Sequence, residues 1–239
     1  MIPVLLRQLR FRLLALLAAA LLFYLGEPGL HQHEAEATSI DELLQPTGIS
    51  FSAANLAGLA AVVLLAGFIA GHRRRGYYRL QFSHPTRPLA FYGLRWVVSV
   101  VLAVCVAAAF FLVGQAAAWG EVRVGPGFLL HAVAFAVMYG GLMAFFSAAL
   151  PAGDGAAAAV VYLFTTFWLE VTLNWPVSPI APGLSRAVSF LLPPHTAATD
   201  VYSAMLMGSV AWGALAYCVG YGLFWLIAGG LLVRIRDWP

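Results

Sequence analysis

Six long apolar runs, separated by shorter polar segments, dominate the pattern of this chain. A helix that crosses the hydrocarbon core of a bilayer needs about 20 predominantly apolar residues, and each run comes close to that length. The sequence therefore predicts an all-α, polytopic membrane protein with six transmembrane helices in a single transmembrane domain, residues 1–239. The predicted spans cover about residues 11–25, 51–71, 96–119, 128–150, 156–173 and 210–233.

A short basic segment precedes the first apolar run. Arg7, Arg10 and Arg12 alternate there with leucines, and this pattern is typical of an amphipathic helix that lies at the membrane surface. We expect such a helix at the N-terminus. The alternative is that these residues simply begin the first span.

The connection before the last span, residues 174–209, is apolar for much of its length. Its two apolar stretches, 188–192 and 201–207, are separated by Pro193 and Pro194. We expect two short helices at the outer membrane face, forming a partly re-entrant external segment. Because backbone at membrane depth must be shielded by protein or line a cavity, this segment is expected near a functional path.

The distribution of basic residues predicts the orientation. All 13 basic residues are arginines, and two of them, Arg123 and Arg186, fall on the opposite side from the rest. Since arginines gather on the cytoplasmic side of membrane proteins, both termini are expected in the cytoplasm, with the protein in the inner (plasma) membrane. The net charge of +3 then indicates attraction to anionic lipid and no nucleic-acid partner. The arginines on the expected cytoplasmic side are Arg7, Arg10, Arg12, Arg73, Arg74, Arg75, Arg79, Arg87, Arg95, Arg234 and Arg236.

Composition excludes several kinds of chemistry. Hydrophobic residues make up 62% of the chain and charged residues 10%, which leaves little room for a soluble domain. Because the chain has no lysine, it lacks the P-loop lysine that reaches the phosphates of ATP. No nucleophile-elbow or zinc-protease motif occurs, so we expect no enzyme activity. Cys105 and Cys218 lie inside apolar runs and are expected to be small core residues.

Few ionisable residues fall inside the predicted spans, where such residues usually indicate function. Glu170 lies in the fifth run with Thr165 and Thr166 before it, and these three are candidates for a substrate or proton path. The alternative for Glu170 is a carboxylate at the headgroup boundary or one bonded to a neighbouring helix. His131 is expected to be a hydrogen-bonded histidine near the interface rather than a haem ligand, because no other histidine lies inside a predicted span.

Two further patterns have weaker implications. His31 and His33, with Glu34 and Glu36, have the ligand types of a loose metal site, but an acidic solvated loop is favoured and no metal is expected. Small residues also recur at four-residue spacing, which permits close helix packing. They are Gly67 and Gly71, then Gly140, Ala144 and Ala148, then Ala216 and Gly220.

The cytoplasmic connection, residues 72–95, interleaves arginines with aromatic residues. This pattern predicts a short amphipathic helix along the membrane. An equal alternative is that its aromatic and basic faces form a docking surface for an acidic soluble partner. The candidate docking residues are Arg74, Arg75, Gly76, Tyr77, Tyr78, Arg79, His84, Pro85 and Arg87.

Three short motifs carry a resemblance to a known family, together with the order of the six predicted spans and the basic N-terminal segment. They are Arg75-Gly76, the run Ser83-His84-Pro85-Thr86-Arg87, and Leu191-Leu192-Pro193-Pro194 before the last span. The chain resembles the permease subunits of type-2 ABC transporters, in the exporter group. The resemblance implies a dimer, either of two copies or with a homologous permease. It also implies separate cytoplasmic ATPase subunits that bind ATP and magnesium and dock on residues 74–90, the coupling helix.

The resemblance thus implies an ATP-driven exporter permease that works by alternating access and holds no cofactor of its own. The apolar spans favour a hydrophobic or amphiphilic substrate, and membrane lipid is an expected partner. One alternative is a non-transporting anchor or regulatory subunit of a larger membrane complex. Another is a membrane-embedded enzyme or cofactor carrier.

Overall fold

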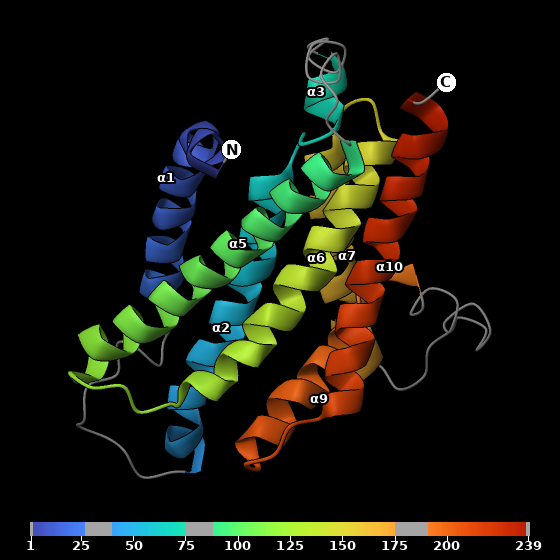
Figure 1. The fold of residues 1–239 in the computed structure, drawn as a ribbon. Helices are drawn as coiled ribbons and strands as arrows, with labels where there is room; N and C mark the ends of the chain where they lie inside the picture. The colour runs from blue at the N-terminus through green and yellow to red at the C-terminus, as the bar shows by residue number, and fades with distance from the viewer. Residues whose placement is uncertain (1, 27–39, 75–87, 175–190, 238–239) are drawn as a thin grey trace.

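The computed structural model describes residues 2–26, 40–74, 88–174 and 191–237, and all regular structure in these ranges is helical (Figure 1). The all-α class is therefore confirmed. The elements are α1 (Ile2–Gly26), α2 (Ile40–Leu65), α3 (Ala70–Arg74), α5 (Pro88–Trp119), the 3-10 turn η2 (Pro126–Phe128), α6 (Leu129–Ala149), α7 (Asp154–Asn174), α9 (His195–Leu206) and α10 (Trp212–Asp237).

Four segments in the described ranges are long and apolar enough to cross a membrane. They are Gly48–Arg74, Leu89–Trp119, Pro126–Ala149 and Trp212–Ile235. They coincide with the second, third, fourth and sixth predicted spans, so these four have the length and composition of membrane-spanning helices. The first and fifth predicted spans lie on α1 and α7, where Asp154–Thr165 forms a shorter apolar stretch.

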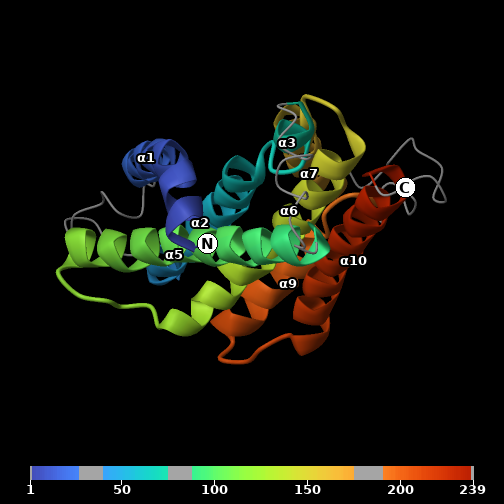
Figure 2. The same cartoon turned by 45° about the horizontal axis from the view of Figure 1, so that its top comes forward.

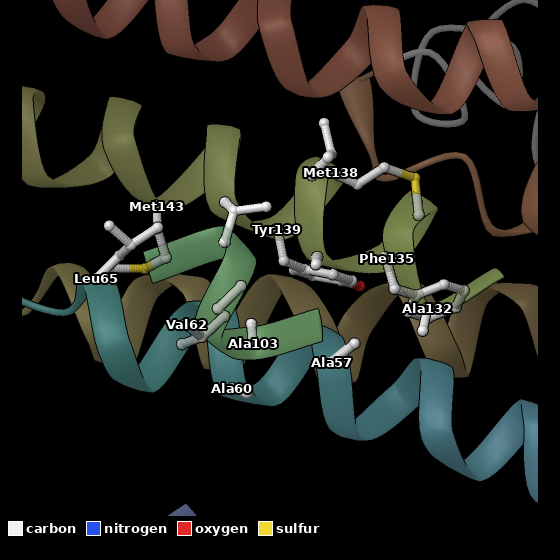
Figure 3. Packing of buried hydrophobic residues seen from close by; sticks show 14 of the residues in the cluster. Ala57, Ala60, Val62, Leu65, Ala103, Ala132, Phe135, Met138, Tyr139 and Met143 are labelled. Carbon is white, nitrogen blue, oxygen red and sulfur yellow. The ribbon is translucent and has the colours of Figure 1, made fainter. Parts of the chain in front are cut away.

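Helix α6 occupies the centre of the bundle, with α2 on one side and α10 on the other (Figures 1 and 2). Its side chains are buried along most of its length. Figure 3 shows Phe135 and Tyr139 of α6 lying over α2, near Ala57 and Ala60. Small residues on α2 allow this approach: a Cβ atom added at Gly58 would lie 3.0 Å from Cδ2 of Tyr139. In lipid, such close packing is the main force that holds helices together.

Helices α6 and α10 approach each other backbone to backbone. A Cβ atom at Gly141 of α6 would collide with the carbonyl oxygen of Gly222, and one at Gly222 of α10 would collide with that of Val137. The predicted contact residue Gly140 is confirmed, since a Cβ there would lie 2.8 Å from Cγ2 of Val100. The prediction for Gly220 was wrong, because nothing lies within 4 Å of its Cβ position.

Helix α1 is a single helix whose first turns run at an angle to the rest (Figures 1 and 2). The predicted N-terminal amphipathic helix is therefore not a separate element, because no break divides the basic segment from the first apolar run. Leu14, Leu17 and Leu21 of α1 are each at least 58% exposed. Rows of large exposed apolar side chains are costly in water and suit contact with lipid.

Candidate functional site

The helix that begins with α2 is interrupted just before the basic connection, residues 72–95, that was predicted to be cytoplasmic. α2 ends at Leu65, a turn follows, and α3 begins at Ala70. Gly67 in this turn has φ = +69°, a left-handed conformation that glycine adopts without steric cost. The turn frees backbone groups that an unbroken helix would have paired internally. We call residues 65–70 the helix break.

The N–H groups at the helix break are bonded by side chains from other helices. Gly67 N–H donates to Oδ2 of Asp154, at the start of α7, over 2.7 Å. The Oγ atom of Ser147, near the end of α6, accepts from the N–H groups of Ile69 at 3.0 Å and Ala70 at 3.1 Å. Ser147 and Asp154 are themselves buried.

The carbonyl groups before the break are also bonded. Nη1 of Arg12, on α1, donates to the carbonyl oxygens of Val63 at 3.1 Å and Leu64 at 2.8 Å. In return, Nη1 of Arg73, on α3, donates to the carbonyl oxygen of Ala148 at the end of α6. An unpaired backbone group in lipid costs several kcal/mol, so these bonds make the interruption a stable feature of the fold.

A second polar cluster lies where α9 packs against α6, at the opposite end of the bundle from α3 (Figure 1). The Tyr139 hydroxyl and Nε2 of His195 are 2.7 Å apart. The Tyr162 hydroxyl of α7 donates to Oδ1 of Asn55 in α2, also at 2.7 Å. The Tyr221 hydroxyl of α10 donates to the carbonyl oxygen of Leu191 at 2.8 Å. The bonds of Tyr139 and Tyr221 fasten α9 and the preceding Leu191 to α6 and α10, and we call these two bonds the α9 latch. Tyr162, whose ring centroid is 6.2 Å from that of His195, joins α7 to α2 next to them.

His131 lies beside the α9 latch in an aromatic environment. It is fully buried, and neither ring nitrogen has a hydrogen-bond partner in the described part of the chain. Its ring centroid is 5.7 Å from that of Phe51, 5.0 Å from Phe135 and 5.6 Å from Tyr202. The prediction that His131 is hydrogen-bonded was therefore wrong. The nearby histidine is His195, whose ring also contacts Phe135, at 5.1 Å.

The structure describes the side chains of two of the other predicted site residues. Thr165 is buried, and its hydroxyl donates to the carbonyl oxygen of Val161 in its own helix. Arg74 is exposed at the end of α3. Thr166 and Glu170 lie on α7, but their side chains are outside the described set. The metal candidates His31 and His33 also lie outside the described residues, as do the docking candidates Arg75, Gly76, Tyr77, Tyr78, Arg79, His84, Pro85 and Arg87.

The two cysteines differ from each other. Cys218 is buried on α10, as predicted, whereas Cys105 is exposed on α5. The prediction of a core position for Cys105 was wrong, because this face of α5 is directed away from the bundle. Among the described residues, no three His, Cys, Asp or Glu side chains form a group that would hold a metal ion.

The burial of His195 predicts a pH-dependent stability. Desolvation by burial lowers the pKa of His195 from 6.5 to about 4, so the folded protein holds a neutral ring where the unfolded chain binds a proton. The free energy of unfolding should be at its full value above about pH 6.5 and should fall by roughly 3 kcal/mol as the pH drops toward 4.

Unfolding midpoints in mild detergent between pH 7.5 and pH 4.5 would test this prediction. His195→Gln offers a neutral acceptor to the Tyr139 hydroxyl and should make the pH dependence shallower. Parallel curves for the wild type and this variant would contradict it.

No protein family, curated protein or solved structure matches this chain. The protein is therefore described by its fold and its two polar clusters. It is an all-helical protein of membrane type, with one interrupted helix and a short helix latched across one end of the bundle.

Proposed function

We propose that this chain is the membrane-spanning permease subunit of an ATP-driven exporter of the type-2 ABC class. It moves a hydrophobic or amphiphilic substrate by alternating access, and separate cytoplasmic ATPase subunits supply the energy. The observation that carries the proposal is the helix break, which lies directly before the predicted coupling segment.

A discontinuous membrane helix with side chains bonded to its free backbone groups is a recurrent feature of transporters. Here α3 ends at Arg74, where the docking candidates begin. The bonds of Arg12, Ser147 and Asp154 link the break to α1, α6 and α7. Movement of the docking segment would therefore reach three helices at once, and a passive anchor has no need of this linkage.

The six-span topology of the proposal adds α1 and α7 to the four long apolar segments. α1 has 25 residues and α7 has 21, and both lengths suffice to cross the hydrocarbon core. The chain ends and α3 lie at one end of the bundle and α9 at the other (Figure 1). With the arginine-rich end in the cytoplasm, α9 becomes part of the external, partly re-entrant segment.

The α9 latch then closes the outer end of the permease. The region around it is apolar and aromatic, with single hydroxyl and imidazole groups at Tyr139, Tyr162, His131 and His195. Such a lining suits a substrate that is largely apolar and carries few polar groups. Binding of ATP by the partner subunits would shift the population between closed and open arrangements of this end. A second permease, identical or homologous, would complete the path.

Purification of the full chain in mild detergent tests the proposal first. A cytoplasmic ATPase with a P-loop should co-purify in a fixed ratio, and its ATP hydrolysis should respond to the permease. A preparation holding only other membrane proteins or a pigment would support the anchor or cofactor-carrier alternatives and contradict the proposal.

Neutralising the docking segment should uncouple the complex. Arg74→Gln combined with Arg75→Gln and Arg79→Gln removes charges that would meet an acidic partner surface, so permease-stimulated ATP hydrolysis should fall about tenfold or more. The measurement is ATPase activity in reconstituted vesicles. Arg234→Gln on α10, an exposed arginine at the same end of the bundle, is the matched control. Equal activity in the triple variant and the control would contradict the coupling role.

A further inference from the structure

We propose that His72 is a proton-operated switch, which holds α3 against α5 while its ring is neutral and releases α3 when the ring is protonated. The switch is a contact between two described helices and does not depend on the transport function. Three features carry it: the atoms through which His72 and Arg95 meet, the charge of Arg95, and the position of His72 near the end of α3.

The ring of His72 meets Arg95 through one nitrogen. Nη1 of Arg95 lies 2.9 Å from Nε2 of His72. A guanidinium group stays protonated in proteins and has no acceptor, so Nε2 of His72 must accept the hydrogen bond. The ring is therefore neutral, with its proton on Nδ1. Nδ1 lies 3.4 Å from the Tyr92 hydroxyl, and the two contacts together define the tautomer and the charge of the ring.

Arg95 makes a positive charge on His72 unfavourable. Its side chain is 6% exposed, and no carboxylate in the described ranges pairs with it. A protonated His72 would set Nε2–H against Nη1–H, so that two donors and two positive charges face each other where water screens them poorly. The contact at 2.9 Å cannot persist in that state. Protonation therefore separates the His72 ring, and α3 with it, from α5.

The charged groups on the neighbouring helices add to this repulsion. Arg12 lies close enough for its charge to act unfavourably on Arg95. The carboxylate of Asp154, on α7, accepts the hydrogen bond of Gly67 N–H at the helix break, and the phenol of Tyr92 is buried on α5. The other arginines at this end of the bundle are Arg73 and Arg74 on α3 and Arg234 on α10.

Protons can reach His72 from the solution at this end of the bundle. His72 is the third residue of α3, it is half-buried, and the exposed Arg74 follows two residues later. The apolar segment Gly48–Arg74 also ends there. Histidine side chains change charge between about pH 5 and 8, so a moderate acidification would operate the switch. In the proposed permease, acid would thereby release the start of the docking segment from α5.

Amide hydrogen exchange of the full chain in mild detergent, between pH 8 and pH 5, tests the switch. His72→Gln is the reference, because an amide oxygen can accept from Arg95 and does not titrate. The ratio of wild-type to His72→Gln exchange rates at residues 70–74 cancels the pH dependence common to all amides. We expect a ratio near one at pH 8 and at least about tenfold at pH 5. His195→Gln, at a histidine on α9, should keep the wild-type profile at residues 70–74.

A permanently charged side chain gives an independent test. In His72→Arg, residues 70–74 should exchange at pH 8 as fast, relative to His72→Gln, as the wild type does at pH 5. A wild-type ratio that stays near one down to pH 5, or slow exchange in His72→Arg, would overturn the proposal. If either variant does not fold, nitrogen NMR of the wild-type His72 ring decides: at pH 8 the proton should lie on Nδ1, and a proton on Nε2 would overturn the proposal.

Discussion

A single methyl group at Gly222 is expected to disrupt the bundle, whereas the same methyl group at Gly220 should have almost no effect. In Gly222→Ala the new Cβ would collide with the carbonyl oxygen of Val137 on α6, and this neighbour is backbone that cannot rotate away. Separating α6 from α10 would open one of the two most extensive interfaces of the central helix. Overpacking costs about 1–3 kcal/mol, and we expect the upper end of this range because the neighbouring atom is backbone.

The measurement is the thermal unfolding midpoint in mild detergent, together with the fraction of monodisperse protein after size-exclusion chromatography. Gly220→Ala is the matched control, because it lies two residues away on the same helix and its Cβ position is open. Gly141→Ala approaches the same interface from α6 and should reproduce the loss. Midpoints for Gly222→Ala and Gly220→Ala that agree within error would refute the close approach of the two helices.

The pair Gly222 and Gly220 also shows what a spacing pattern can and cannot predict. Small residues four apart identify helices that are able to pack closely, and Gly140 indeed meets Val100. The pattern does not determine which face of α10 turns inward. Because each residue rotates a helix by about 100°, a shift of two residues moves a glycine from the interface to the exposed side.

Hydropathy predicted the long helices well because lipid exposure requires continuous apolar sequence. The predicted run 128–150 corresponds to α6 with η2, and 210–233 corresponds to α10. The ends were less accurate where polar residues continue a helix beyond the apolar core. α2 begins at Ile40, eleven residues before the predicted span 51–71. α5 begins at Pro88, eight residues before the predicted span.

The helix break had no local signature of comparable strength. Residues 65–70 are all apolar or glycine, and they lie within the predicted span 51–71. The bonds that stabilise the break come from Arg12, Ser147 and Asp154, which are distant in the sequence. In the sequence, Asp154 lies between the predicted fourth and fifth spans, 128–150 and 156–173. Only the folded arrangement identifies its carboxylate as the acceptor for Gly67.

The proximity of His131 and His195 could not be predicted from the sequence for a related reason. His131 lies in an apolar run, whereas His195 follows two prolines in a connection. Nothing in their spacing indicates that both rings contact Phe135. A polar residue in an apolar run is a visible signal, but its partner depends on how α9 folds back onto α6.

Removing the carboxylate of Asp154 is expected to weaken the helix break and, in the proposed transporter, to uncouple it. In Asp154→Ala the half-buried N–H of Gly67 loses the acceptor that the 4% exposed Asp154 provides. The cost should be about 1–3 kcal/mol. Asp154→Asn retains a side-chain oxygen in the same place and should be close to the wild type. Ser147→Ala removes the acceptor of two N–H groups and should be at least as damaging.

Two measurements separate a structural role from a coupling role. Amide hydrogen exchange at residues 66–70 should rise in Asp154→Ala and Ser147→Ala, and permease-dependent ATP hydrolysis in vesicles should fall about tenfold because the docking segment is no longer tied to α6 and α7. Asp200→Ala, at an exposed carboxylate on α9, is the control for both. Faster exchange with unchanged ATP hydrolysis would mean that the bonds only satisfy the backbone. If coupling is lost in Asp154→Ala but retained in Asp154→Asn, the hydrogen bond to Gly67 is what coupling requires. Both variants lack the charge of Asp154, and only Asp154→Asn keeps an acceptor oxygen.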